Sequence, residues 1–345
     1  MPCASRWAAP SGVILSILDQ SPIRSGGTAA EAIQETLQLA ERADRLGYHR
    51  YWLAEHHSSG GLAGSAPEVL IGQVASRTSR IRVGSGGVML SHYSALKVAE
   101  NFRVLEALFP GRIDLGIGRA PGSDQRTARA LRAGPGALGL EQFPQQLADL
   151  ISFLHDELPP GHPFTGVRAM PAGPTAPPLW ILGSSGEGAL LAAHFGTAFS
   201  YAHFINADGG TEAAQAYREN FRPSPHLAAP MASVAAFVLC ADTEDQAERL
   251  ARCRDLFIVR LYTGRFGPFP SVEEAAAYEF SPPELAIVAN ARARTVAGTP
   301  DRVKARLEAL ASGYGVDEVV VVTIAHEFKA RLRSYELLAE VFGLF

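Results

Sequence analysis

The sequence has few cysteines and no excess of basic residues. Cys3, Cys240 and Cys253 are its three cysteines, an odd number without C-x-x-C spacing, so neither a disulfide framework nor a cysteine zinc site is indicated. The formal net charge of −4 excludes the broad basic surface that binds nucleic acid or an anionic membrane. No run approaches the roughly 20 apolar residues of a membrane-spanning helix. These features are typical of a globular cytoplasmic protein with reduced thiols.

The N-terminal stretch "MPCASRWAAPSG" has one arginine and lacks the apolar segment that a signal peptide needs. We therefore expect residues 1–12 to be a disordered lead-in and residues 13–345 to form a single domain. Hydrophobic residues make up 47% of the chain, which is enough for a large core.

Short aliphatic or β-branched runs alternate with longer segments whose apolar residues recur three or four positions apart. The runs predict eight strands, at residues 13–18, 50–54, 81–85, 112–117, 178–182, 197–201, 232–239 and 318–324. The other segments predict helices at residues 29–46, 67–78, 95–108, 143–156, 186–195, 211–221, 244–262 and 326–343. Apolar strands separated by amphipathic helices indicate a parallel sheet covered by helices. Eight such units favour an α/β fold of the closed (β/α)8 type, a TIM barrel, over a doubly wound sheet.

Three regions interrupt this alternation. Residues 120–140 and 158–177 are rich in glycine, proline and alanine and are predicted to be loops. Residues 264–300 form a long insertion between the seventh and eighth predicted strands. Long irregular segments in a compact domain often serve binding, so we expect residues 264–300 to act as a lid.

Glycines or polar residues follow most of the predicted strands. In a (β/α)8 barrel, the carboxyl ends of the strands carry the chemistry. The residues in question are Asp19 after the first strand, Glu55-His56-His57 after the second, Ser85-Gly86-Gly87 after the third, Arg119 after the fourth, "GSSGEG" (183–188) after the fifth and His203 after the sixth. The clustering predicts the site at this rim.

The "GSSGEG" stretch opens a predicted helix directly after a strand. Free backbone N–H groups there, with the hydroxyls of Ser184 and Ser185, suit a phosphate. An ordinary helix cap with glycines for a tight turn is the alternative. Arg119 lies on the adjoining unit, from which an arginine can reach the same anion. The two features together favour a ligand that carries a phosphate.

The acid and two histidines of "EHH" (55–57) are compatible with a metal site, a proton-transfer site or a polar strand end. Adjacent strand residues point to opposite faces, so His56 and His57 are not expected to bind one ion, and no metal is predicted. By the same argument, Glu55 and His57 point away from the face that carries His56. In "GSGGVML" (84–90), three glycines interrupt an apolar run and predict a bulge close to a ligand.

The blocks "GYHRYWLAEHH", "RIRVGSGGVMLSHYSALKVAENFRVLEALFPGRIDLGIGRAPGSD" and "WILGSSGEG" together resemble the luciferase-like flavin-dependent monooxygenases of the bacterial luciferase superfamily. The resemblance extends over nearly the whole chain. It implies a barrel that takes reduced FMN (FMNH2) from a separate flavin reductase. With O2, a C4a-hydroperoxyflavin then oxygenates a small organic substrate, such as an aldehyde or a secondary metabolite of the polyketide type. It also implies a homodimer, formed through residues 67–78 and 95–108.

The resemblance assigns roles to particular residues of this sequence. Ser85, Gly86 and Gly87 match the segment beneath the flavin ring, with a non-prolyl cis peptide between the two glycines. The remaining matches are Arg119, Ser184, Ser185 and Gly186 at the phosphate, and His56 as the histidine of proton transfer.

Two positions depart from the family pattern. Glu187 replaces a bulkier aromatic residue, and "SYAHFINADGG" matches only in "AHF", which leaves the role of His203 open. Two alternative functions share the same features: hydride transfer with the deazaflavin coenzyme F420, and flavin binding without turnover.

Overall fold

The computed structural model describes residues 12–119, 124–131 and 140–345. Its core is a closed ring of eight parallel strands: β1 (Ile14–Asp19), β2 (Arg50–Leu53), β3 (Arg82–Ser85), β5 (Ile113–Gly118), β6 (Leu179–Gly183), β7 (Ala198–Ala202), β8 (Ala232–Cys240) and β10 (Glu318–Val322). They pair in this order, and β10 pairs with both β1 and β8 to close the ring. The predicted (β/α)8 barrel is confirmed, and each strand lies within two residues of its expected range. The expected lead-in lies outside the described residues, apart from Gly12.

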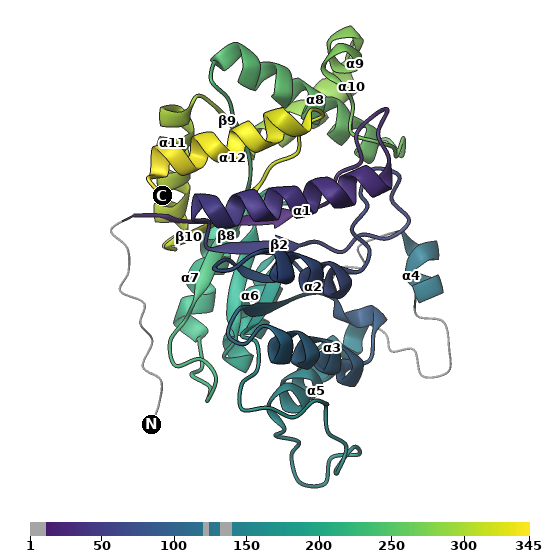
Figure 1. The fold of residues 1–345 in the computed structure, drawn as a ribbon, viewed down its shortest axis with the longest axis vertical. Coiled ribbons are helices and arrows are strands. Elements are labelled where there is room, and N and C mark those ends of the chain that lie inside the picture. The colour runs from purple at the N-terminus through teal and green to yellow at the C-terminus, as the bar shows by residue number, and fades with distance from the viewer. Residues whose placement is uncertain (1–11, 120–123, 132–139) are drawn as a thin grey trace.

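Helices surround the barrel (Figure 1). Those predicted are present within two residues of their expected bounds: α1 (Ala29–Leu46), α2 (Pro67–Arg77), α3 (Ala95–Leu108), α5 (Phe143–His155), α6 (Gly186–Phe195), α7 (Gly210–Asn220), α8 (Glu244–Tyr262) and α12 (Phe328–Phe342). Four further α-helices in the described ranges were not predicted: α4 (Gln125–Leu131), α9 (Val272–Ala277), α10 (Pro282–Ala293) and α11 (Pro300–Tyr314). None of the helices in the described ranges is long and apolar enough to cross a membrane.

Helix α1 shows how local sequence sets the bounds of an element. The Thr28 hydroxyl accepts a hydrogen bond from the Glu31 backbone N–H, and the Glu31 carboxylate accepts one from the Thr28 N–H, which forms a capping box. At the other end, Gly47 adopts a left-handed conformation with φ 85°. Glycine takes this conformation without steric cost, so the helix ends there, as predicted.

The predicted bulge is present and lies between β3 and β4 (Val88–Met89). Both short strands pair with β5: Gly84 stands opposite Asp114, and Val88 stands opposite Ile117. Four steps along the first chain therefore match three along β5, so one extra residue is accommodated. Gly86 and Gly87 lie at this point, joined by a cis peptide bond.

The insertion between β8 and β10 is folded rather than a loop. Helices α9 and α10 pack on α8, and the short strand β9 (Thr295–Gly298) pairs with β8. Its first residues are tied to the loop after β1, because Phe269 exchanges backbone hydrogen bonds with Ile23 and Ser25 at 2.7 and 2.8 Å. In contrast, residues 156–178 contain neither helix nor strand, as the prediction of a loop at 158–177 requires.

Alternate residues of the strands face the barrel interior and the helices. On β2, Tyr51 and Leu53 pack toward the helices, whereas Trp52 packs inside against Trp180, with ring centroids 5.1 Å apart. Charged residues occupy the amino-terminal end of the barrel, where Arg50 contacts Asp114 and Glu318 at 2.8 Å each. Since these groups lie at strand starts, they stabilise the end opposite the expected site.

Candidate active site

Two cavities open among the residues that follow the strands. The smaller has a volume of about 250 Å³ and the larger about 550 Å³. Both are lined by Phe204 and Ile205, so they share a wall just after β7. The volume of the larger cavity is within the range typical of small-molecule sites. Figure 1 shows α4 beyond this end of the barrel, with α9 and α10 above it.

The smaller cavity brings together five of the predicted site residues: Gly86, Gly87, Arg119, Ser184 and Ser185. The rest of its wall is mainly apolar and includes Leu18, Trp52, Ile181, Leu182 and Val320. The predicted clustering of these residues at one rim is therefore observed. An apolar chamber with a polar end suits a ligand that has a flat ring system and an anionic tail.

Gly86 and Gly87 form a floor that admits no side chain. A Cβ on Gly86 would lie 2.4 Å from Leu18 Cδ1, and one on Gly87 would lie 2.8 Å from the Gly116 carbonyl oxygen. The cis peptide expected at this position is present. The backbone itself thus lines the cavity, so a planar ligand can lie directly against it.

The polar end of the smaller cavity combines a helix start with an arginine. Ser185 is the N-cap of α6 and makes no side-chain capping hydrogen bond. The backbone N–H groups in the first turn of α6 lie at the positive end of the helix dipole, which favours binding of an anion. Arg119, at the end of β5, forms an ion pair with the exposed Glu187 in the first turn of α6. This pairing shows that Arg119 reaches the helix start.

Two predicted ligand-binding residues do not line either cavity. Ser85 is fully buried, and its hydroxyl donates to the Gly116 carbonyl at 2.7 Å while accepting from the Gly116 N–H at 3.0 Å. It ties β3 to β5 behind the wall. Gly186 is exposed as the first residue of α6.

His56 lines the larger cavity rather than the smaller one. Its Nδ1 is buried and has no hydrogen-bond partner in the described part of the chain. Burial, followed by the nearby charge of His57, lowers the pKa of His56 to about 4. The imidazole is consequently neutral at pH 7, able to accept a proton or to offer one hydrogen bond.

The expectation that His57 and Glu55 point away from the His56 site is wrong for His57. Strand β2 ends at Leu53, so strand alternation does not extend to residues 55–57, and His57 lines the same cavity as His56. The buried Glu55 carboxylate contacts His57 Nε2 at 2.6 Å and accepts hydrogen bonds from Tyr93 Oη at 2.7 Å and Met89 N at 3.0 Å. Glu55 therefore positions its neighbours.

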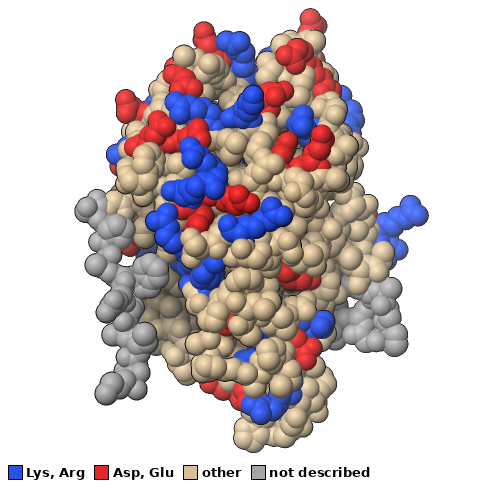
Figure 2. All heavy atoms as spheres, in the orientation of Figure 1, with Lys and Arg blue, Asp and Glu red and all other residues tan. Residues whose placement is uncertain are grey.

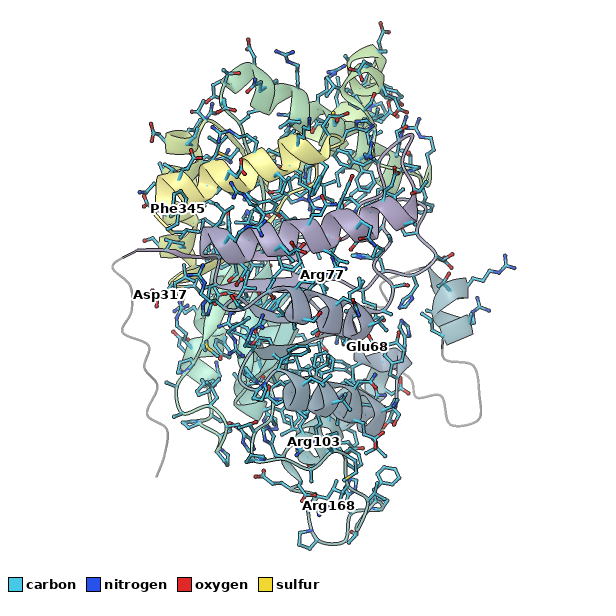
Figure 3. The ribbon with its side chains drawn as sticks, in the orientation of Figure 1. Glu68, Arg77, Arg103, Arg168, Asp317 and Phe345 are labelled. Carbon is cyan, nitrogen blue, oxygen red and sulfur yellow. The ribbon has the colours of Figure 1, made fainter. Side chains whose placement is uncertain are left out.

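Glu68 lies beside this cluster, at the amino-terminal end of α2 (Figure 3). Burial, with a contribution from Glu55, raises the pKa of Glu68. Burial is thus the main cause of the pKa shifts of His56 and Glu68 in this region, and neighbouring charged groups add to it. In the described ranges, no group of three or more His, Cys, Asp or Glu side chains is arranged to hold a metal ion.

His203 packs outside the two cavities. It lines neither cavity, and its Nδ1 lies 3.0 Å from the hydroxyl of Tyr314 on α11. Burial, with the charges of Arg294 and Arg306, lowers the pKa of His203.

Two arginines that were not predicted as site residues, Arg254 and Arg294, line the larger cavity. A signal for the first was present. Ala247, Ala251, Arg254 and Ile258 recur at helical spacing in α8, so a charged residue stands in an apolar stripe. Such a position indicates a buried charge with a particular role.

Comparisons with known proteins agree on one family. The family model for luciferase-like monooxygenases matches residues 14–318. An uncharacterised Bacillus subtilis protein, YwcH, is 51% identical over 96% of this chain and 99% of its own length. The N-acetyl-S-alkylcysteine monooxygenase of B. subtilis is 39% identical over 94% of this chain and 97% of its own. The crystal structure of apo-MsnO8 superposes with a TM-score of 0.88, at 41% identity, and covers 97% of this chain and 98% of its own.

More distant structures show the shared fold alone. One is the oxygenating constituent of 3,6-diketocamphane monooxygenase of Pseudomonas putida in complex with FMN, with 19% identity and a TM-score of 0.70. Another is an F420-dependent secondary alcohol dehydrogenase, with 12% identity and a TM-score of 0.71. The match of the family model over most of the chain, and relatives more than 30% identical along nearly all of it, establish that the protein belongs to the luciferase-like monooxygenase family.

Proposed function

We propose that this protein is a flavin-dependent monooxygenase that uses FMNH2 and O2 to oxygenate a small organic substrate. The observation that carries the proposal is the pair of adjoining cavities. One has a glycine floor and an anion-binding end, and the other contains the imidazole of His56, with Phe204 and Ile205 between them. A cofactor in the first cavity would lie next to a substrate in the second.

The residues of the smaller cavity fit FMN. The ring system would lie on the backbone of Gly86 and Gly87, where a Cβ would collide with Leu18 or with the Gly116 backbone. Arg119, Ser184 and Ser185 would hold the phosphate, Arg119 exchanging its ion pair with Glu187 for the ligand. When bound, reduced FMN supplies the electrons that activate oxygen for transfer to the substrate.

His56 is proposed to handle a proton at its buried Nδ1, which has no partner among the described residues. Because its pKa is about 4, the imidazole is neutral at physiological pH and acts as a base or as a neutral hydrogen-bond donor. Glu55 holds His57 and the backbone of Met89, which fixes the walls on either side of the site.

Relatives support oxygen chemistry. A family member 39% identical over nearly the whole chain is named a monooxygenase. An F420-dependent enzyme shares the fold, so the fold does not distinguish FMN from F420. FMN is therefore part of the proposal. The proposal includes a separate flavin reductase as the source of reduced FMN, as the family resemblance implies.

The test is an anaerobic titration with reduced FMN and, separately, with reduced F420, followed by admission of O2. We expect reduced FMN to bind, and its reoxidation by O2 to be slowed, with a long-lived absorbance distinct from that of oxidised FMN. Tight binding of F420 without binding of FMN would contradict the proposed monooxygenase function and would indicate hydride transfer. Binding of FMN with reoxidation as fast as in free solution would indicate a flavin carrier.

Two variants test the phosphate end in the same titration. Arg119→Ala removes a charge-assisted contact and should weaken reduced-FMN binding about tenfold or more. Glu187→Gln removes the competitor of the phosphate for Arg119 and should strengthen binding severalfold. Equal affinities in all three proteins would show that the phosphate does not bind at this end of the cavity.

A further inference from the structure

A buried arginine that has no carboxylate partner among the described residues lies in the wall of the larger cavity. Arg254 on α8 is 3% exposed, and its Nε has no hydrogen-bond partner in the described part of the chain. Its Nη1 makes a long contact of 3.3 Å with the Ala291 carbonyl, and its guanidinium stacks on the Phe237 ring at 4.1 Å from the centroid. Burying a cation in this way is costly unless an anion meets it.

A second arginine reinforces the positive charge. Arg294, directly after α10, is half-buried and lines the same cavity. It donates from Nη1 to the Ile205 carbonyl and from Nη2 to the Tyr262 hydroxyl at 3.2 Å. Burial, together with the charge of Arg294, lowers the pKa of Arg254 to about 10, so Arg254 remains charged at neutral pH.

The acids of this region are paired with other arginines. Asp255 next to Arg254 is held by Arg292 at 2.6 Å. The other two arginines of the cavity wall have partners of their own: Arg260 contacts Glu274, and Arg265 contacts Glu284, each at 2.6 Å. No ion pair between described residues includes Arg254 or Arg294.

One acid lines the cavity as well. It is Asp124, which accepts hydrogen bonds from the Arg126 and Thr127 N–H groups and from the Thr127 hydroxyl. Its contacts hold it in its own turn at the start of α4. Arg254 and Arg294 line the same cavity, and both are outside the ion pairs between described residues.

Much of the remaining wall of the larger cavity is apolar. Its wall includes Leu62, Phe204, Phe237, Phe257, Ile258, Leu261, Phe266 and Ile324. An apolar chamber with two cations and His56 in its wall matches one ligand class. Such a ligand has an anionic group at one end and a hydrophobic body.

We propose that the larger cavity binds a carboxylate-bearing organic substrate, with its carboxylate on Arg254 and Arg294 and its apolar part between the aromatic side chains. A carboxylate is planar and matches the fork of a guanidinium, whereas the phosphate of the cofactor has a separate site at Arg119. The inference deepens the proposed function, on which it rests, by naming the substrate class of that site.

The test compares octanoate with its neutral analogue octanamide by isothermal titration calorimetry. The protein is used without added flavin at pH 7.5. We expect octanoate to bind at least tenfold more tightly than octanamide. Arg254→Met should abolish this preference without lowering the thermal midpoint, because the variant removes a buried charge that has no carboxylate partner among the described residues. Arg249→Met is the matched control, because Arg249 lies on the exposed face of the same helix and should leave the preference intact.

Arg294→Met is a second variant, at a residue that is half-buried. It should reduce the preference for octanoate over octanamide severalfold. Equal affinities of octanoate and octanamide for the unmodified protein would overturn the inference. So would equally tight binding of inorganic phosphate at the expense of octanoate, since that indicates a general anion site. Because no flavin is added, a protein that prefers octanoate but fails the reduced-FMN titration keeps the carboxylate site and loses the proposed monooxygenase function.

Discussion

His56 shows how one position acquires its chemistry from its surroundings. The residue follows a buried strand, and the cavity leaves its Nδ1 without a partner among the described residues. Burial and the neighbouring His57 shift its pKa to about 4, against an ordinary value near 6.5. The shift favours the neutral form, so the histidine that the resemblance assigns to proton transfer is a neutral imidazole at physiological pH.

The pH dependence of oxygenation tests this assignment. Because neutral His56 is the active form and its pKa lies near 4, the contribution of His56 should be constant from pH 8 to about pH 5 and fall only as the pH approaches 4. Replacing it, as in His56→Asn, should lower turnover roughly 100-fold, the usual scale of lost acid–base catalysis. The measurement is the initial rate of oxygenation of a carboxylate substrate with a constant supply of reduced FMN.

The control variant is His203→Asn. Since His203 lines neither cavity and contacts Tyr314, its replacement should leave the rate and the pH profile close to those of the unmodified protein. An inflection near pH 6.5 that disappears in His56→Asn would contradict the neutral-imidazole assignment, and full activity of His56→Asn would remove it from catalysis.

At the scale of elements, the insertion after α8 was expected to be a loop that covers the site. The structure shows helices α9 and α10 and strand β9 instead, and the first residues of the insertion, before α9, are irregular. Arg265, Phe266 and Gly267 line the larger cavity, and the first two are exposed. The segment that we propose as a lid is therefore residues 263–268, which are followed by the buried Phe269.

Limited proteolysis tests this wall. A ligand in the larger cavity should contact residues 265–267 and slow tryptic cleavage after Arg265 severalfold. Cleavage after Arg168 is an internal control, because this exposed arginine lies in the loop at the far end of the molecule from α9 and α10 (Figure 3). Unchanged cleavage at Arg265 with saturating FMN and octanoate would contradict a role for the segment in covering the site.

At the scale of the whole molecule, charge is unevenly distributed over the surface. Figure 2 shows charged side chains gathered over α1 and α12, and few over α2 and α3. Three large apolar side chains are exposed on those two helices: Val69 at 65%, Val104 at 46% and Leu108 at 63%. Exposed apolar side chains grouped on adjoining helices are typical of protein–protein contacts, which supports the homodimer that the family resemblance implies.

Light scattering after gel filtration tests the dimer. The unmodified protein should elute with twice the mass of one chain, and the double variant Val69→Lys and Leu108→Lys should elute as a monomer, because burying two ammonium groups in an apolar interface is unfavourable. Leu285→Lys is the control, as Leu285 is equally apolar and exposed, but lies on α10. A monomeric unmodified protein at micromolar concentration would contradict the proposal, and so would a double variant that remains dimeric.

The barrel and most of its element bounds could be predicted from the sequence, because periodicity and local capping act over short distances. Thr28, Glu31 and Gly47 set the ends of α1 through contacts with near neighbours. The same is true of "GSSGEG", whose strand, turn and helix start follow one another directly. The missed helix α11 carried the signal too, since Val303, Leu307 and Ala311 recur at four-residue spacing.

The tertiary structure decided which side chains come into contact and in which protonation state the buried ones are. His57 turned toward the His56 cavity because β2 ends earlier than the apolar pattern suggests, and Ser85 turned into the wall because its hydroxyl bonds to Gly116. Arg254 and Arg294 belong to segments 40 residues apart, and only folding places both in one apolar wall. Local sequence fixes elements through short-range hydrogen bonds and periodicity, whereas burial and the pairing of charges depend on the packing of distant segments.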